Sequence, residues 1–156
     1  MKVSLVFFYI SVLFISPEVQ SEQFRGSVIK VLDGDTIEVL HNMTSVRIRL
    51  KNIDAPEKKQ PFGEWSRQQL KSLVFDHPVT VIWTQKDRYG RILGQVSTAS
   101  TDVNRSMVER GAAWVYSPYN SDPTLPPLQR AAQREKRGLW SEAYPIQPWK
   151  WRKSNG

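Results

Sequence analysis

Charged residues of the types used in phosphate chemistry gather in three short stretches of the sequence. One stretch carries Arg49, Asp54 and Glu57 in close succession, directly after an alternating run of apolar and basic residues. The other two, at 33–36 and 87–91, are rich in aspartate, arginine and glycine. An arginine beside carboxylates is most often an ordinary surface ion pair. All three stretches fall at the ends of predicted strands, however, where a scaffold can direct side chains to one site.

These residue types match the needs of phosphodiester hydrolysis. Arginine makes two-pronged contacts with phosphate and stays charged, which suits Arg49 and Arg91. Carboxylates such as Asp35 and Asp54 can hold a hard divalent cation. A further carboxylate, Glu57, could take a proton from the attacking water. Each signal alone is weak, since Asp-Gly-Asp and Tyr-Gly-Arg usually mark turns.

The elements that must position these residues form an α+β, mainly β, pattern. Period-2 alternation predicts strands at 24–32, 35–40, 45–50, 79–85 and 92–98. Helical spacing predicts helices at 64–75, around 103–108 and at 128–137, the second capped by Asp102 or Asn104 and ended by Gly111. This order predicts a five-stranded, OB-fold-like barrel with three helices, a fold whose faces commonly bind oligonucleotides.

The ends of the chain differ from this central part. Residues 1–21, with one lysine and a short apolar run, are typical of a secretory signal peptide that is cleaved after Ser21. Cleavage would leave about 135 residues, enough for one domain, which we place at 22–142. The remaining 143–156 form a basic, tryptophan-rich tail. We therefore expect a secreted or periplasmic protein with no stable membrane span after cleavage.

Composition excludes several kinds of site. The sequence has no cysteine, which excludes a thiolate nucleophile and cysteine-ligated zinc, and its two histidines are predicted turn residues. The net charge of +7 indicates a polyanionic partner: nucleic acid, an anionic membrane surface or an acidic glycan. Carboxylates thus remain as metal ligands.

Taken in order, the motifs resemble the staphylococcal nuclease (thermonuclease) family. The matching pieces are V-L-D-G-D-T at 31–36, R-L-K-N-I-D-A-P-E at 49–57 and D-R-Y-G-R at 87–91, with weaker matches at 103–111 and 138–142. The resemblance covers roughly 26–142. Three motifs in the right order and spacing are far more specific than any one of them.

The resemblance implies a fold and an activity. It implies an OB-type barrel that hydrolyses DNA and RNA and leaves 3′-phosphate ends. The family's calcium-binding carboxylates fall on Asp35 and Asp54, and its general base falls on Glu57. Its two phosphate-binding arginines fall on Arg49 and Arg91.

Further positions follow from the same resemblance. Ala55 stands where a threonine gives its backbone carbonyl to the cation, which alanine can also supply. Tyr89 matches a tyrosine near the terminal phosphate, and Arg88 replaces a lysine there. Asp33 matches an aspartate just outside the metal ligands, and the loop after Glu57 is shorter than in the founding member.

Aromatic residues indicate a preference for single strands. Unpaired bases can stack on Tyr89, Tyr116 and Tyr119, whereas Trp114 is equally compatible with stacking and with the core. We expect a monomer that binds single-stranded DNA and RNA better than duplex.

Two other functions compete with an exported, sugar-nonspecific nuclease. A barrel that has lost catalysis would be a single-stranded nucleic-acid-binding module, but such a module has no use for a base such as Glu57. A basic domain attached to membrane or cell wall would leave three spaced motifs unexplained. Incubation with single-stranded DNA and calcium would separate the three functions: a nuclease releases acid-soluble fragments, a binding module binds without releasing them, and the third kind of domain does neither.

Overall fold

The computed structural model describes residues 20–155, within which five strands close into a barrel in the order β1-β2-β3-β6-β5. The strands are β1 (Glu22–Asp33), β2 (Thr36–His41), β3 (Thr44–Leu50), β5 (Pro78–Lys86) and β6 (Ile92–Ser97). Most of the expected signal peptide, 1–19, lies outside the described residues. The predicted five-stranded barrel is confirmed.

Alternation along the strands builds the barrel core. Ile37, Val39 and Ile48 are fully buried, while Glu38 and Arg47 pair on the outer face at 2.7 Å. All strand pairs are antiparallel except β3–β6, which runs parallel and closes the barrel.

Gly94 makes this closure possible. A Cβ at Gly94 would lie 2.8 Å from Ile48 Cγ2 and 2.9 Å from Val81 Cγ1, closer than carbon atoms pack. A larger residue on β6 would therefore push the strands of the barrel apart.

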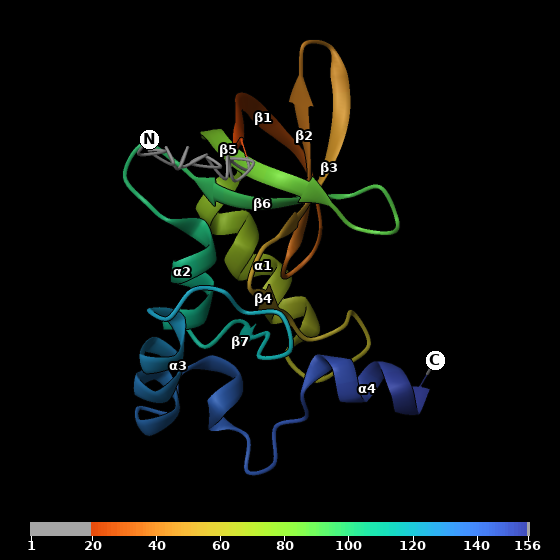
Figure 1. Cartoon of the computed structure of the whole chain (residues 1–156). Helices are drawn as coiled ribbons and strands as arrows, with labels where there is room; N and C mark the ends of the chain where they lie inside the picture. The colour runs from red at the N-terminus through yellow and green to blue at the C-terminus, as the bar shows by residue number, and fades with distance from the viewer. Residues whose placement is uncertain (1–19, 156) are drawn as a thin grey trace, which may run out of the picture.

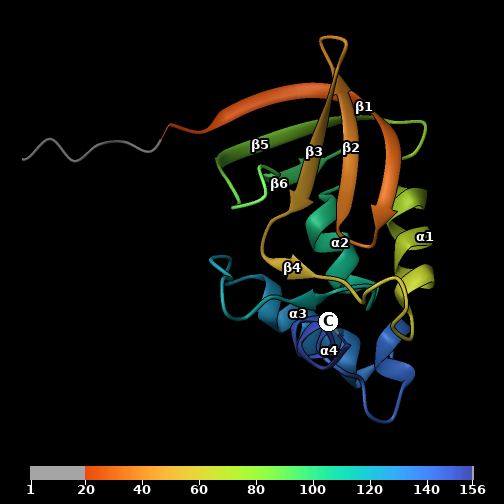
Figure 2. The same cartoon turned by 90° about the vertical axis from the view of Figure 1, so that its right-hand side faces the viewer.

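Helices lie beside and below the barrel (Figure 1). They are α1 (Gly63–Val74), α2 (Val103–Glu109), α3 (Leu125–Arg134), the 3₁₀ turn η1 (Gly138–Ser141) and α4 (Pro148–Asn155). A two-stranded sheet of β4 (Ile53–Asp54) and β7 (Trp114–Val115) lies between the barrel and α3. Figure 2 shows the same division, with α3 and α4 at the end of the molecule opposite the tip of the β2–β3 hairpin. Of the two predicted caps, Asp102 is the one that caps α2, by accepting a hydrogen bond from the Arg105 amide at 3.0 Å, and Gly111 follows the end of the helix at φ 66°, as predicted.

Two predicted boundaries of the third helix are wrong. The helix begins at Leu125 and not at 128, because Pro126 and Pro127 occupy its first turn, where proline costs no hydrogen bond. It ends at Arg134, with Lys136 in the left-handed conformation at φ 51°, before Gly138 is reached. The described residues also form a fourth helix, α4, beyond the three predicted, and two short strands, β4 and β7, that the sequence pattern did not predict.

A second hydrophobic cluster joins the helices at the base of the barrel. Trp114, Ala132, Leu139 and Trp140 are buried there, and Phe62 and Trp149 pack against them. The sequence left Trp114 open between a core position and stacking with bases. Trp114 is only 8% exposed, so the core position is confirmed and stacking is wrong. Among residues 20–155, no helix is both long enough and apolar enough to cross a bilayer.

Candidate nuclease site

The tight turn between β1 and β2 places the first carboxylates. Asp33 Oδ1 accepts a hydrogen bond from the Asp35 amide at 3.0 Å, and the Asp35 carbonyl accepts one from the Leu50 amide at 2.7 Å. A Cβ at Gly34 would overlap Ser66 Oγ on α1, so only glycine lets the helix pack this closely on the turn. The Asp-Gly-Asp motif thus fixes Asp35 against the end of β3.

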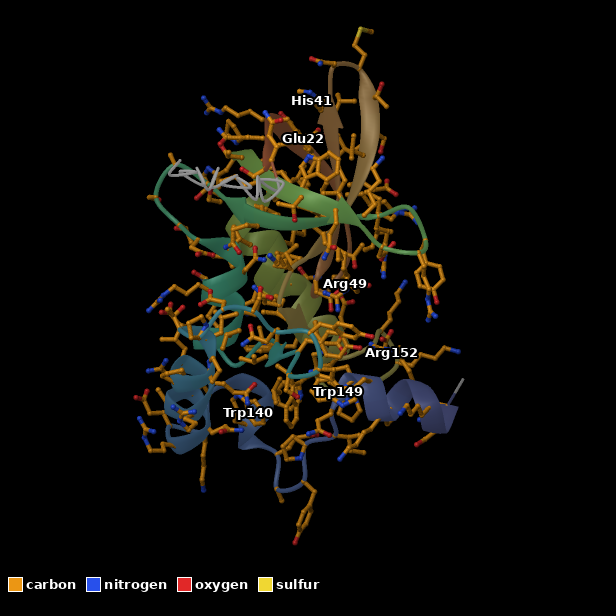
Figure 3. The ribbon with its side chains drawn as sticks, in the orientation of Figure 1. Glu22, His41, Arg49, Trp140, Trp149 and Arg152 are labelled. Carbon is orange, nitrogen blue, oxygen red and sulfur yellow. The ribbon has the colours of Figure 1, made fainter. Side chains whose placement is uncertain are left out.

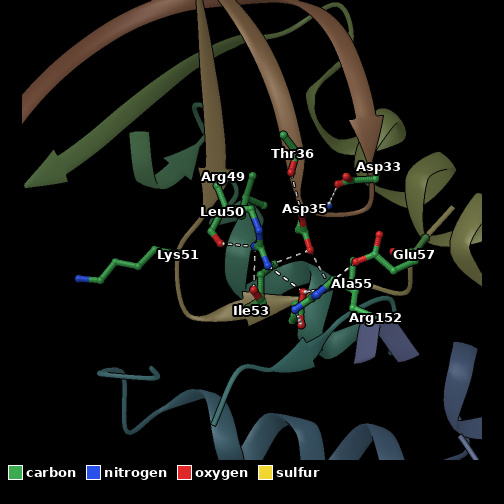
Figure 4. Close-up of polar contacts among 12 residues, drawn as sticks. Asp33, Asp35, Thr36, Arg49, Leu50, Lys51, Ile53, Ala55, Glu57 and Arg152 are labelled. Atoms are coloured by element: carbon green, nitrogen blue, oxygen red, sulfur yellow. Dashed lines mark hydrogen bonds and ion pairs between the residues drawn. The ribbon is translucent and has the colours of Figure 1, made fainter. Parts of the chain in front are cut away.

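Arg49, on β3, is the hub of the site (Figure 4). Its Nη1 donates to the backbone carbonyls of Leu50 at 2.9 Å and Ile53 at 2.8 Å. Its Nη2 lies 2.8 Å from Asp54 Oδ1 and 3.2 Å from Asp35 Oδ2. Since the side chain is only 11% exposed, these contacts are screened little by solvent.

Asp35 and Asp54 therefore present oxygens on either side of one guanidinium nitrogen. Both are buried, with 5% and 1% of their surface exposed. Asp35 also accepts from the Ala55 amide at 2.7 Å and from the Thr36 hydroxyl at 2.9 Å. Two adjacent carboxylate oxygens are the donor type that a hard cation such as calcium prefers, so the residues fit the ion chemically. In residues 20–155, however, no cluster of three or more carboxylate, histidine or cysteine side chains forms a ready-made metal cage.

Burial changes the acidity of this region. Burial, the largest effect, and the neighbouring Asp35 raise the pKa of Asp33 to about 8. Burial also raises the pKa of Asp54 to about 6, because it outweighs the hydrogen bond from Arg152 and the charge of Arg49. Asp54 is thus mostly ionised at neutral pH, whereas Asp33 is mostly protonated.

Glu57 lies in the turn that follows β4. Its backbone amide donates to Gln60 Oε1 at 3.0 Å, and its carbonyl accepts from the Gln60 amide at 2.8 Å. Gln60 is 6% exposed, so a buried amide holds the loop that follows Glu57. The Glu57 carboxylate is 37% exposed and faces the cleft.

The turn between β5 and β6 carries the second arginine. Asp87 accepts hydrogen bonds from the Tyr89 amide at 2.9 Å, the Arg91 amide at 3.0 Å and Arg91 Nε at 2.7 Å. Partial burial opposes ionisation of Asp87, but these hydrogen bonds lower its pKa overall. Tyr89 is 69% exposed, and the Arg88 guanidinium lies 5.0 Å from the centre of its ring.

One cleft of about 1210 Å³ joins these groups. All the site residues predicted from the sequence line it: Asp35, Arg49, Asp54, Ala55, Glu57, Arg88, Tyr89, Arg91, Tyr116 and Tyr119. Arg49 directly contacts Asp35 and Asp54, whereas Arg91 is paired with Asp87. Tyr116 and Tyr119 lie just after β7, with ring centres 5.3 Å apart.

Arg152 also lines the cleft, and the sequence pattern did not indicate it as a site residue. Arg152, on α4, contacts both Asp54 and Glu57. The tail carried two usable signals: Pro148 suits the first position of a helix, and Trp149 and Arg152 are three residues apart, hence on one helical face. These signals are weak because the tail is basic, and a basic segment usually lies in solvent. Most charged residues of the tail are indeed exposed.

Several known proteins with similar sequences are described as nucleases or endonucleases, which agrees with the residues gathered in this cleft. Residues 47–142 match the family model described as staphylococcal nuclease homologue. An Escherichia coli protein described as an uncharacterized endonuclease is 58% identical over 143 residues, spanning 90% of this chain and 94% of its own length. A micrococcal nuclease of Shigella flexneri is 43% identical, over 85% of this chain and 82% of its own. An uncharacterized endonuclease of Haemophilus influenzae is 41% identical, over 81% and 71%. With its motifs in one cleft at the edge of a five-stranded barrel, this chain belongs to the staphylococcal nuclease family and is a nuclease.

Proposed function

We propose that the protein is an exported, sugar-nonspecific nuclease that hydrolyses phosphodiester bonds of DNA and RNA to leave 3′-phosphate ends. The observation that carries the proposal is the shared cleft, in which a base, two arginines and two buried carboxylates surround a space open to solvent. A module that only bound nucleic acid would have no use for this arrangement.

Arg49 and Arg91 act on the phosphoryl group. Charge builds on the phosphoryl oxygens in the transition state, and guanidiniums directed at those oxygens stabilise it more than they stabilise the substrate. Hydrogen bonds to the carbonyls of Leu50 and Ile53 hold Arg49 in place before substrate arrives. Arg91 must turn from Asp87 toward the phosphate, or bind it with the guanidinium nitrogens that Asp87 leaves available.

Glu57 activates the attacking water. Its exposed carboxylate can accept the proton of a water molecule in the cleft, a role typically worth about 10²–10⁴-fold in rate. The hydrogen bonds between Glu57 and Gln60 restrict the backbone that carries this carboxylate.

Asp35, Asp54 and the backbone carbonyl of Ala55 would hold calcium. When bound, the ion supplies additional positive charge close to the phosphoryl oxygens. Support for these ligands comes from the two carboxylate oxygens that meet at Arg49 Nη2. The Ala55 amide assists by donating to Asp35 and so orienting its carboxylate.

Three exposed or half-buried tyrosines suit single-stranded substrates. Tyr89 lies on the β5–β6 turn, whereas Tyr116 and Tyr119 line the cleft from the segment after β7. Base stacking on such rings is worth about 1–3 kcal/mol per base and requires unpaired bases. Arg88 adds positive charge beside Tyr89, so we expect a monomer that prefers single strands and binds them less tightly as salt rises.

A cleavage assay tests the proposal. Purified protein is incubated with single-stranded DNA or RNA in calcium or in chelator, and acid-soluble fragments are measured. We expect fragments with 3′-phosphates and 5′-hydroxyls. Kinase should label their 5′ ends directly, whereas terminal transferase should extend their 3′ ends only after a phosphatase has removed the 3′-phosphate. Glu57→Gln should abolish most of the activity, whereas Glu64→Gln, which changes an exposed carboxylate on α1, should not.

Two results would contradict the proposal. Binding of single strands without fragments would favour the binding module, and full activity of Glu57→Gln would show that another group activates water. Cleavage that survives exhaustive chelation would remove calcium from the scheme and leave the roles of the arginines intact.

A further inference from the structure

Arg152 reaches the candidate site from almost the end of the chain. Its Nη1 lies 2.7 Å from Glu57 Oε1 and 3.1 Å from Asp54 Oδ1, and its Nη2 lies 2.9 Å from Asp54 Oδ2. The guanidinium thus engages both oxygens of Asp54 and one oxygen of the residue to which we assign the base. Figure 3 shows Arg152 on α4 at the same edge of the barrel as Arg49.

Packing of the tail fixes the position of Arg152. The Trp149 ring lies 5.2 Å from that of Tyr116 and 6.0 Å from that of Trp114, and Pro148 is buried. Just before α4, the Ile146 carbonyl accepts a hydrogen bond from Gln60 Nε2 at 2.6 Å. Because the other end of the Gln60 amide holds the Glu57 backbone, the tail and the base are parts of one connected structure.

Electrostatics explains why a cation belongs at this position. Asp54 is 1% exposed and lies beside the buried Asp35, and two buried carboxylates are stable only when positive charge compensates them. Arg49 supplies one positive charge between them. Arg152 supplies a second. Burial lowers the pKa of its guanidinium, but the hydrogen bonds to Asp54 and Glu57 together with the charges of these carboxylates outweigh burial and raise that pKa overall.

We propose that Arg152 is a positioning residue of the nuclease site that occupies the place of a cation on Asp54 and Glu57, so that a divalent cation must displace it to bind Asp54. This inference rests on the proposed function, which makes Asp54 a cation ligand. A calcium ion needs lone pairs of the Asp54 carboxylate, and those oxygens accept hydrogen bonds from Arg152. The resting protein therefore pairs Glu57 Oε1 with a guanidinium, although the carboxylate is 37% exposed, and displacement of Arg152 by the ion frees that oxygen.

Calcium titration calorimetry without nucleic acid tests the competition. The full mature chain is compared with Arg152→Gln and with the matched control Lys153→Gln, which removes the same charge from an exposed position on the same helix. Charge-assisted hydrogen bonds of this kind correspond to about 10- to 100-fold in an equilibrium constant, so Arg152→Gln should bind calcium tighter by about that factor. Lys153→Gln should change the affinity by less than about twofold, as expected for an exposed charge.

Equal or weaker calcium binding by Arg152→Gln would overturn the proposal and leave Arg152 a structural ion pair. The proposal would also be overturned if none of the three proteins bound calcium. Because no nucleic acid is present, these outcomes are independent of the cleavage assay. A protein that cleaves DNA and binds calcium, but no more tightly as Arg152→Gln, loses only the role of Arg152, whereas a protein that cleaves DNA without binding calcium loses the calcium ligands as well.

A second measurement avoids dependence on the folding of the glutamine variant. The guanidinium ¹⁵N signals of Arg152, identified by their loss in Arg152→Lys, are recorded in chelator and in calcium. We expect slow rotation of the guanidinium in chelator, where Asp54 and Glu57 hold it, and fast rotation in calcium. Unchanged slow rotation at saturating calcium would show that the ion and Arg152 do not compete.

Discussion

Asn104 joins three backbone segments at the back of the site, and its replacement should be strongly destabilising. The side chain is 1% exposed. Its Oδ1 accepts from the Val96 amide at 3.0 Å, and its Nδ2 donates to the carbonyls of Lys51 at 3.0 Å and Gly94 at 3.1 Å. Helix α2 is thereby tied both to β6 and to the turn that leads from Arg49 to Asp54.

The magnitude follows from the groups left without partners. In Asn104→Ala, the Val96 amide and the Lys51 carbonyl lose these hydrogen bonds, whereas the Gly94 carbonyl keeps the one from the Lys51 amide at 2.9 Å. Each buried unsatisfied group costs about 1–3 kcal/mol, so the free energy of unfolding should fall by about 2–5 kcal/mol. This is a large part of the total stability of about 5–15 kcal/mol that is typical of a domain.

Asn104→Asp separates hydrogen bonding from side-chain shape. Aspartate keeps the acceptor for Val96 but points a second oxygen at two carbonyls, so at pH 7 it should destabilise at least as much as alanine. The charged form is disfavoured in the folded protein, which raises the pKa of the new carboxyl above its unfolded value of about 3.9. The variant should therefore regain stability as the pH falls from 7 toward 5.

Urea unfolding followed by circular dichroism measures both effects. Gln95→Ala serves as the control, because it removes a side-chain hydrogen bond of 2.7 Å to Asp102 at the protein surface and should cost about 1 kcal/mol or less. An Asn104→Asp variant as stable as the wild type at pH 7 would refute the reasoning. So would a loss below about 1 kcal/mol in Asn104→Ala, since the buried groups would then have found other partners.

Three further predictions concern the site and the N-terminus. Because burial raises the pKa of Asp33 to about 8, the folded protein keeps a proton that the unfolded chain releases above the ordinary aspartate pKa of about 3.9. The free energy of unfolding should therefore fall with rising pH across that window, by about 1.4 kcal/mol per pH unit. Asp33→Asn should remove this slope in urea unfolding at pH 6.5 to 7.5 with chelator present, a range above the raised pKa of Asp54 of about 6, and an unchanged slope there would refute the assignment. The double variant Glu57→Ala with Arg91→Ala should lose less turnover than the product of the two single losses, because the effects of residues that act as a unit are not additive. Losses that multiply, or near-normal turnover of Arg91→Lys, would argue against a catalytic unit. Exported protein should begin at Glu22 by N-terminal sequencing, and recovery of a chain that starts at Met1 would contradict cleavage after Ser21.

Local patterns in the sequence determined much of the barrel and of its site. The alternation at 44–50 defines β3 and places Arg49 on the face opposite Ile48, whatever the rest of the chain does. The Asp33-Gly34 turn, the capping position before α2 and the left-handed Gly111 depend on only a few neighbouring residues, so residue types predicted them, although they left the cap open between Asp102 and Asn104. The order and spacing of the motifs indicated the family, which no single turn could have indicated.

Short or irregular elements could not be predicted from such patterns. The strands β4 and β7 have two residues each, too few to show a period, and they pair only because Ile53 meets Val115 across 62 residues of sequence. Trp114 has the same residue type whether it stacks on bases or packs in a core. Its burial was decided by Trp140 and Trp149, which reach it from segments far along the chain.

Arg152 shows most clearly what only the tertiary structure decided. The sequence presents it among exposed lysines in a tail, where charge and composition favour solvent. Packing of Trp149 and the hydrogen bond from Gln60 to Ile146 bring the tail back to the barrel and place the guanidinium on Asp54, 98 residues away in sequence. Residue types and spacing define what a side chain can bind, but its partners across such a separation depend on how all the intervening elements pack.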